Sequence, residues 1–252
     1  MSTEVSAAGR IEVQGRRSPA GRGGAIDAHL VSLVSPKSFE AEQYRSLRHA
    51  LDRTRPPAGP RVVAVTSPGV GDGKTTTAIN LAGAYAQSQG ARVLLVDADM
   101  RRPGVAVRLG LPERSRGLAD LLADPSLDLD AAIRTPSEQT LSVLTAGRER
   151  RDPHLLLQSD TLGVLMHRIR TRFDKVIVDT PPVLAVRDSH LLEAFVDGFL
   201  LVVASGYTSR HGLGESLDEM APGKVLGIAF NRDHSRFTGH YRAYGRYYAP
   251  TA

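Results

Sequence analysis

The sequence contains no cysteine among its 252 residues. Disulfide bonds, thiolate nucleophiles and thiolate metal sites are therefore excluded. No apolar run approaches the roughly 18 to 20 residues that a helix needs to cross a bilayer. The first residues also lack the apolar core of a signal peptide. These absences predict a soluble protein that works inside the cell.

The length and the charge set the next limits. A chain of this length suits one large domain, or one domain with tails, and can bury a sizeable core. The formal net charge is +5, and arginines gather at both ends. Basic ends favour anionic membranes or nucleic acid, although they are more often simply solvated. These arginines are Arg10, Arg16, Arg17, Arg22, Arg232, Arg236, Arg242 and Arg246.

Three regions follow from the composition. Residues 1–30 are rich in Gly, Ala, Ser and Arg without apolar periodicity, which predicts a disordered leader. Residues 31–233 form the predicted domain, and residues 234–252 form a tyrosine-rich tail. The domain is expected to open with a helix over 36–53, capped by Ser35. That helix has an apolar stripe and an opposite charged stripe, made respectively by Tyr44, Leu47 and Leu51 and by Glu42, Arg45 and Arg48.

Short, continuous apolar segments alternate with helical or irregular stretches along the domain. A strand that is apolar along its whole length must be covered on both faces, which is typical of a parallel sheet wrapped by helices. The predicted fold class is therefore α/β with an open, mostly parallel sheet. The expected strands are 61–66, 92–96, 141–144, 175–178, 199–203 and 225–230, and the expected helices include one ending near 89, 117–122 and 154–170.

A glycine-rich loop lies between the first predicted strand and an alanine-rich helical pattern. It reads Ser-Pro-Gly-Val-Gly-Asp-Gly-Lys-Thr-Thr-Thr over 67–77. Glycines let backbone N–H groups approach phosphate oxygens, a lysine reaches the outer phosphates, and a threonine hydroxyl can bind Mg²⁺. Pro68 stands where the strict motif has glycine, and the alternative is an ordinary tight turn. The predicted nucleotide ligands here are Gly69, Gly71, Asp72, Gly73, Lys74, Thr75 and Thr76.

Three aspartates follow two of the predicted strands. Asp97 and Asp99 end one strand, and Asp179 ends another. Ligands of parallel sheets bind at the carboxyl ends of the strands, where carboxylates can hold Mg²⁺ or take a proton. An isolated aspartate at such a position is usually a helix cap. Three beside a phosphate loop favour a metal and catalytic cluster.

The last twelve residues contain four of the seven tyrosines, interleaved with Gly, Ala and Arg, and no acidic residue follows Asp233. They lack apolar companions at helix or strand spacing, which indicates exposure. Arginine with tyrosine can stack on single-stranded nucleic acid, and a sticky disordered tail is an equal alternative. The four are Tyr241, Tyr244, Tyr247 and Tyr248.

Together these segments resemble the bacterial tyrosine kinases of capsule and exopolysaccharide synthesis, a P-loop family unrelated to eukaryotic protein kinases. The resemblance covers the chain from about Ser35 to its end. Residues 42–48 match the family's E-x2-R-x2-R oligomerisation motif, 66–75 its phosphate loop, 94–103 its second Walker-type motif and 176–182 its Walker B segment. The tyrosine cluster stands where the family phosphorylates itself.

The resemblance implies ATP and Mg²⁺ as cofactors and a role for each site residue. Lys74 would act on the phosphates, and Thr75, Asp97 and Asp179 at the metal. Asp97 would also activate the acceptor hydroxyl, assisted by Asp99. Asn231 and Arg232, after the last strand, would flank the adenine.

The resemblance also implies partners and a location. A ring-like homo-oligomer would form through Glu42, Arg45 and Arg48, with the tail of one subunit entering the site of its neighbour. A separate transmembrane activator of the chain-length-determinant type would hold the protein at the inner face of the plasma membrane. Protein tyrosine substrates and a cognate phosphotyrosine phosphatase would complete the set, without nucleic acid.

Two other functions are compatible with parts of the sequence. A regulatory ATPase switch of the septum-positioning and partitioning type shares the sheet and the Walker motifs. Such ATPases usually carry an extra lysine in the loop, where this chain has Gly69. A nucleic-acid-binding module would use the basic aromatic tail and bind with strong salt dependence.

Overall fold

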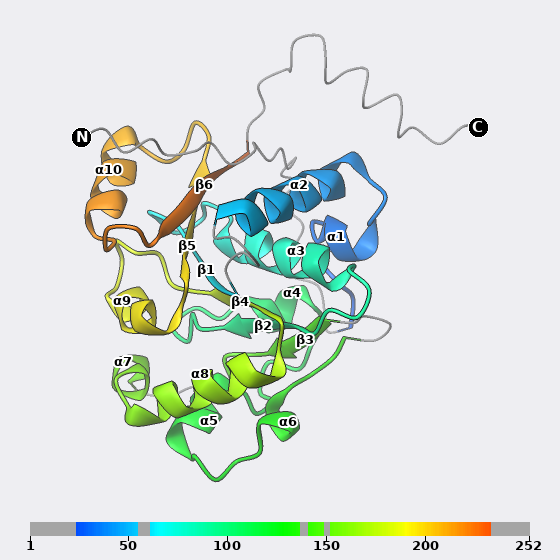
Figure 1. Ribbon diagram of the computed structural model, residues 1–252, viewed down its shortest axis with the longest axis vertical. Coiled ribbons are helices and arrows are strands. Elements are labelled where there is room, and N and C mark those ends of the chain that lie inside the picture. The colour runs from blue at the N-terminus through cyan, green and yellow to red at the C-terminus, as the bar shows by residue number, and fades with distance from the viewer. Residues whose placement is uncertain (1–23, 55–60, 137–140, 149–151, 233–252) are drawn as a thin grey trace.

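The computed structural model describes residues 24–54, 61–136, 141–148 and 152–232. In that part of the chain a six-stranded sheet, parallel throughout, carries helices on both faces (Figure 1). The strand order is β3-β2-β4-β1-β5-β6. The predicted fold class is confirmed. The strands are β1 (Val62–Thr66), β2 (Val93–Asp97), β3 (Leu141–Leu144), β4 (Lys175–Asp179), β5 (Gly198–Ala204) and β6 (Val225–Asn231).

The strands form where the sequence is continuously apolar because both faces of the sheet are covered. In β1, Val62 and Ala64 pack into one core, whereas Val63 and Val65 pack into the other. All five residues of β1 are buried. Alternate side chains of one strand thus supply two separate cores, which is why no polar alternation is seen.

The helices divide between these two cores (Figure 1). One face is covered by α1 (Val31–Val34), α2 (Phe39–Thr54), α3 (Lys74–Ala86) and α4 (Val105–Arg108). The other is covered by α5 (Leu118–Ala123), α6 (Leu129–Ala132), α7 (Pro153–Leu157), α8 (Asp160–Arg172), α9 (Asp188–Leu192), the 3-10 turn η1 (Glu193–Phe195) and α10 (Arg210–Asp218). Among the described residues, none of these helices is long and apolar enough to cross a bilayer.

The first predicted helix starts later than expected. Residues 31–34 form a short helix of their own, and α2 begins at Phe39. Ser38, rather than Ser35, caps it: the Ser38 hydroxyl oxygen accepts a hydrogen bond from the Ala41 amide at 3.1 Å. The apolar stripe is as predicted, since Tyr44, Leu47 and Leu51 are fully buried.

The charged stripe of α2 does not face wholly outward. Arg48 donates hydrogen bonds to the Ala84 carbonyl oxygen and the Ser88 hydroxyl, both at 2.8 Å. It therefore anchors α2 to the segment that contains α3. Glu42 and Arg45 form an ion pair one turn apart.

The folded part begins before residue 31. Leu30 is fully buried, and Asp27 pairs with Arg108 at 3.0 Å while its amide donates to the Arg108 carbonyl at 2.8 Å. The predicted leader thus extends too far, because its last residues pack beside α4. Residues 1–23 and the predicted tail, 234–252, lie outside the described residues.

Two other helix boundaries differ from the sequence prediction. The helix expected over 154–170 is divided into α7 and α8 at Ser159, whose hydroxyl donates to the Leu156 carbonyl at 2.7 Å. Hydroxyl side chains compete in this way with continuing helical bonds. The helix after the glycine loop ends at Ala86 rather than near 89.

Candidate functional site

A cleft of about 900 Å³ opens at the carboxyl edge of the sheet. Its walls come from the glycine loop, from the segments that follow β2 and β4, and from the end of β6. Eight of the predicted site residues lie on this surface, although they are far apart in the sequence. Those lining it are Gly71, Gly73, Lys74, Thr75, Thr76, Asp99, Asn231 and Arg232.

The glycine loop depends on Gly73. Its φ of 96° lies in the left-handed region, which L side chains rarely adopt. A Cβ at this position would lie 1.9 Å from the Asn231 side-chain nitrogen. Asn231 in turn donates to the Asp72 carbonyl oxygen at 2.9 Å. The end of β6 therefore presses directly against the loop where α3 begins.

Asp72 braces the loop from inside. Its carboxylate accepts hydrogen bonds from the Gly69 amide at 2.9 Å and from the Thr208 hydroxyl at 2.7 Å. Asp72 is only 1% exposed, and neither it nor Gly69 lines the cleft. The structure therefore places these two predicted nucleotide ligands behind the loop. Thr208 was missed because its role is a contact between residues 136 positions apart.

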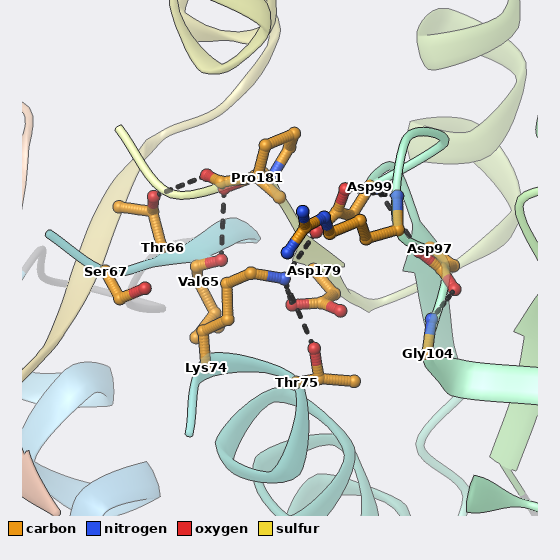
Figure 2. Close-up of polar contacts among 12 residues, drawn as sticks. Val65, Thr66, Ser67, Lys74, Thr75, Asp97, Asp99, Gly104, Asp179 and Pro181 are labelled. Carbon is orange, nitrogen blue, oxygen red and sulfur yellow. Dashed lines mark hydrogen bonds and ion pairs between the residues drawn. The ribbon is translucent and has the colours of Figure 1, made fainter. Parts of the chain in front are cut away.

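Lys74 is the first residue of α3 and extends into the group of carboxylates (Figure 2). Its ammonium nitrogen lies 2.8 Å from Asp99 Oδ2, 3.4 Å from Asp179 Oδ1 and 3.3 Å from the Thr75 hydroxyl. Burial lowers the pKa of Lys74, but the Asp179 and Asp99 carboxylates outweigh it and raise the pKa overall. Lys74 is therefore a fixed cation at neutral pH.

Asp179 ends β4 with one carboxylate oxygen unused. It is fully buried, and its Oδ2 has no hydrogen-bond partner in the described part of the chain. Burial raises the pKa of Asp179, and the nearby Lys74 charge offsets only part of that rise. A buried anionic oxygen without a donor is costly, and a cation beside it would remove that cost.

A magnesium ion fits this position when phosphate oxygens complete its shell. The described residues contain no group of three or more His, Cys, Asp or Glu that could hold a metal by itself. Mg²⁺ commonly takes one or two protein ligands and fills its other positions with water and phosphate oxygens. The Thr75 hydroxyl and Asp179 supply such a partial set.

Asp97 ends β2 directly opposite Asp179 in the register of the two strands. Its Oδ2 accepts backbone N–H bonds from Gly104 at 3.1 Å and Val105 at 3.0 Å, and its Oδ1 accepts one from Asp99 at 3.2 Å. Asp97 therefore orders the start of α4. This is the helix-capping role that the sequence offered as the alternative to a metal and catalytic role. Burial and the charge of Asp179 raise the pKa of Asp97 to about 8.

Arg232 and Tyr207 stand together beside the loop. The Arg232 guanidinium lies 5.7 Å from the centre of the Tyr207 ring, and the Tyr207 hydroxyl is 3.4 Å from the Val70 carbonyl oxygen. Arg232 adopts a positive φ of 56°. Tyr207 was not among the predicted site residues, because an exposed tyrosine after a strand has no distinguishing pattern.

The predicted oligomerisation residues are not among those that line the cleft. Glu42, Arg45 and Arg48 lie on α2, and none of them lines it. The tail tyrosines, Tyr241, Tyr244, Tyr247 and Tyr248, lie outside the described residues.

Comparison with known proteins gives consistent matches. The family model described as an AAA domain matches residues 60–221. The tyrosine-protein kinase YwqD of Bacillus subtilis is 35% identical over 226 residues, covering 89% of this chain and 94% of YwqD. The tyrosine-protein kinase CpsD of Streptococcus pneumoniae is 31% identical over 74% of this chain and 84% of CpsD.

Solved structures with the same arrangement include three of particular use. The chimerical protein CapA2B2 has a TM-score of 0.79 at 30% identity, covering 90% of this chain and 94% of that one. The kinase domain of the Escherichia coli tyrosine kinase ETK has a TM-score of 0.80 at 25% identity, covering 94% of both chains. A ParA family ATPase from Chlorobium tepidum has a TM-score of 0.55 at 23% identity, over 70% of this chain and 75% of its own, and shares the fold alone.

Proposed function

Since the chain belongs to the bacterial tyrosine-kinase family of P-loop proteins, we propose that it transfers the γ-phosphoryl group of ATP to tyrosine hydroxyls. The observation that carries this proposal is the position of Lys74. It lies at the start of a helix, directly after a left-handed glycine, and within 3.4 Å of the Asp99 and Asp179 carboxylates. That arrangement places a site for phosphate beside carboxylates that can hold a metal ion or accept a proton.

The loop and the helix bind the phosphates. Backbone N–H groups at the start of α3 have no partner within the helix and carry partial positive charge. Lys74 adds a full charge, so the terminal phosphates replace part of its contact with Asp99 and Asp179. Thr75 and Asp179 would hold Mg²⁺, which neutralises the phosphate oxygens and orients them. Asn231 and Arg232 are proposed to contact the base.

The acceptor oxygen attacks the γ-phosphorus. A new bond forms between the tyrosine oxygen and phosphorus, the bond to the β–γ bridging oxygen breaks, and ADP leaves. A free tyrosine has a pKa near 10, so the phenolic proton needs an acceptor. Asp97 is proposed to take it: with a pKa of about 8 it is ionised in a minority of molecules at neutral pH, and this ionised form is a stronger base than an ordinary carboxylate.

The acceptors are proposed to be the tail tyrosines 241, 244, 247 and 248 of a neighbouring subunit. Each phosphate adds about −1.5 to −2 charge, so several of them convert a cationic tail into an anionic one. Repulsion between crowded tails would then loosen an oligomer assembled through α2. Residues 42, 45 and 48 are the proposed contact, although Arg48 is also bonded within its own subunit.

The cellular role proposed is control of capsule or exopolysaccharide polymerisation and export. One relative is named for this process, the succinoglycan biosynthesis transport protein ExoP of Rhizobium meliloti, 30% identical over 86% of this chain but only 29% of ExoP. A separate membrane activator of the chain-length type would then hold this protein at the inner face of the plasma membrane, and a phosphatase would reset the tail.

The test is a phosphotyrosine map after incubation with Mg-ATP and an activator fragment. The native protein should carry phosphate on the tail. Lys74→Met should lose it, whereas Lys37→Met, at an exposed lysine outside the cleft, should keep it. A variant with all four tail tyrosines changed to Phe should lose tail label but retain a folded nucleotide site. ATP hydrolysis by the native protein without any tail label would instead support a regulatory ATPase.

A further inference from the structure

A second cleft, of about 740 Å³, adjoins the first. It lies over the segments that follow β2 and β3, beside α4 and the start of α7. Arg101 lines both clefts, so a ligand in one is next to a ligand in the other. Nothing in the transfer chemistry described above uses this second cleft.

The charged lining of the second cleft is mostly positive. Arg101, Arg114 and Arg148 face one acid, Glu113. Arg101 is already held by Asp188, at 2.7 and 3.2 Å. The other two arginines are less committed.

Arg148 and Arg114 are the available cations. Arg148 is exposed, and although its backbone amide donates to Asp120 at 3.1 Å, its guanidinium approaches that carboxylate only to 3.9 Å. Arg114 is also exposed and has no ion pair with any other residue in the described ranges. Arginine side chains pair with phosphate oxygens through two parallel hydrogen bonds, so these two suit a phosphate group rather than a neutral one.

The remaining lining is largely apolar. Met100, Pro103 and Val107 form part of the wall, and Val107 is 42% exposed. An apolar wall beside two arginines suits a ligand that has a ring at one end and a phosphate at the other. Phosphotyrosine has that form.

We propose that this second cleft binds a phosphotyrosine in the tail of a second copy of the chain, and so holds the next tail tyrosine at the first cleft. The inference rests on the proposed function, since the tail must first be phosphorylated. The second cleft would then recognise the product of the first transfer. Later transfers to the same tail would therefore be faster than the first.

Charge distinguishes the two forms of the tail. Residues 234–252 contain three arginines and no acid, so an unmodified tail is repelled by an arginine-lined cleft. One phosphate adds about −1.5 to −2 charge and three acceptor oxygens. The same segment is thereby converted from an unfavourable ligand into a favourable one.

The spacing of the tyrosines suits two adjoining clefts. Tyr241, Tyr244 and Tyr247 recur every third residue. An extended chain covers about 10 Å in three residues, and the two clefts share Arg101 in their walls, so we expect one tyrosine to occupy each cleft. A phosphorylated tyrosine in the second cleft then places its neighbour beside Lys74.

A second copy delivers the tail more easily than the same copy. The tail follows β6, at the opposite edge of the sheet from β3, and five strand spacings amount to about 24 Å. Tyr241 is nine residues beyond Arg232, a reach of about 30 Å at full extension. The tail of one copy would have to cross most of the sheet edge to reach its own second cleft, whereas the tail of a neighbour has no such restriction.

Binding is tested without transfer, on full-length, dephosphorylated Lys74→Met protein. The probes are two fluorescent peptides of residues 239–252, one unmodified and one phosphorylated at Tyr244, measured by anisotropy. The phosphopeptide should bind at least tenfold more tightly, and the difference should shrink with added salt. An Arg114→Glu, Arg148→Glu double variant should abolish the preference, whereas Arg210→Glu, at an exposed arginine that begins α10, should keep it.

A change in the opposite direction sharpens the test. Glu113→Gln removes the acid of the second cleft and should tighten phosphopeptide binding two- to fivefold. Nucleotide affinity, measured in parallel, should be the same with and without the substitutions at Glu113, Arg114, Arg148 and Arg210, which shows that these variants are folded. Equal binding of both peptides, or a preference that survives the double variant, would overturn the proposal.

Transfer by the native protein separates this inference from the proposed function. Peptides with a single free tyrosine at 241 and either phosphotyrosine or Phe at 244 are compared, with Phe at 247 and 248. The phosphorylated peptide should react with a three- to tenfold higher kcat/KM, because its KM is lower while kcat is unchanged. Transfer to both at equal rates would remove the second-cleft proposal but keep the kinase. Phosphopeptide binding without transfer to any peptide would remove the kinase proposal but keep the second cleft as a phosphotyrosine site.

Discussion

The ends of β2 and β4 carry the same residue type in matching positions, yet the two aspartates have different surroundings. Asp97 and Asp179 are paired in register and both fully buried. Asp97 accepts three backbone N–H bonds, whereas Asp179 has an oxygen without a donor. The chain after β2 turns back to supply amides, and the chain after β4 does not. The supply of donors therefore decides which carboxylate is left for a cation.

The largest expected effect is that of Asp179→Asn on phosphoryl transfer. It removes the charge that would hold Mg²⁺, so transfer should fall by about 10³-fold, in the range found when a key electrostatic group is lost. The affinity for nucleotide should also lose its dependence on Mg²⁺. Both quantities are measured by transfer kinetics and by titration with and without the ion. Retention of Mg²⁺-dependent affinity would place the ion elsewhere.

Asp97→Asn should give a smaller and different loss. The amide oxygen can still accept the bonds from Gly104 and Val105, but the side chain no longer takes a proton. Transfer should fall by about 10²-fold, as for loss of a general base, while Mg²⁺-dependent nucleotide affinity stays within about threefold of native. If Asp97→Asn and Asp179→Asn lowered Mg²⁺ affinity equally, the distinction between the two strand ends would be wrong.

Alanine variants of Asp97 and Asp179 should show the opposite order when stability is measured: the loss should be larger for Asp97→Ala than for Asp179→Ala. Asp97→Ala leaves buried amides of Asp99, Gly104 and Val105 without an acceptor and should cost about 1–3 kcal/mol. Asp179→Ala removes an oxygen that had no donor, while Lys74 keeps Asp99, and should cost less than about 1 kcal/mol. Thermal unfolding without nucleotide checks this. A Tm lower for Asp179→Ala than for Asp97→Ala would contradict it.

The last expected effect is a pH dependence of stability without Mg²⁺. The folded pKa of Asp97 is about 8, against about 3.9 for an unfolded aspartate. Between these values the folded state binds more protons, so stability falls as pH rises from about 4 to 8. The slope should stay below the single-group limit of about 1.4 kcal/mol per pH unit.

Unfolding of native protein and of Asp97→Asn from pH 5.5 to 8.5 measures this slope. The decline should be shallower in Asp97→Asn, because the titrating carboxyl has been removed. Native stability that rises over the same range, or an identical decline in the variant, would mean that Asp97 is ionised throughout.

The parallel sheet could be predicted because each of its strands can be recognised from the residues of that strand alone. Each strand is an uninterrupted apolar segment, and a strand of that kind must be covered on both sides. The grouping of Lys74, Asp99 and Asp179 also follows from the sheet, since parallel strands end at one edge. Helix boundaries were less accurate, because competing serines at 35, 38 and 159 look alike before their partners are known.

Contacts between distant segments could not be predicted. Nothing around Asp72 indicates that its carboxylate accepts a hydrogen bond from Thr208, or that Gly73 is required because Asn231 lies against it. The sequence likewise gives no indication that Arg101 pairs with Asp188. Such contacts depend on which strands become neighbours, and a strand order of 3-2-4-1-5-6 is not written in any single segment.

The contact between Asn231 and the glycine loop has a consequence for synthesis of the protein. Asn231 ends β6, the last strand described, and contacts a loop that leaves the ribosome more than 150 residues earlier. A nascent chain thus carries an incomplete nucleotide pocket until nearly the whole domain has emerged. The contact of Asn231 with Asp72 and Gly73 therefore forms only after β6 has been synthesised.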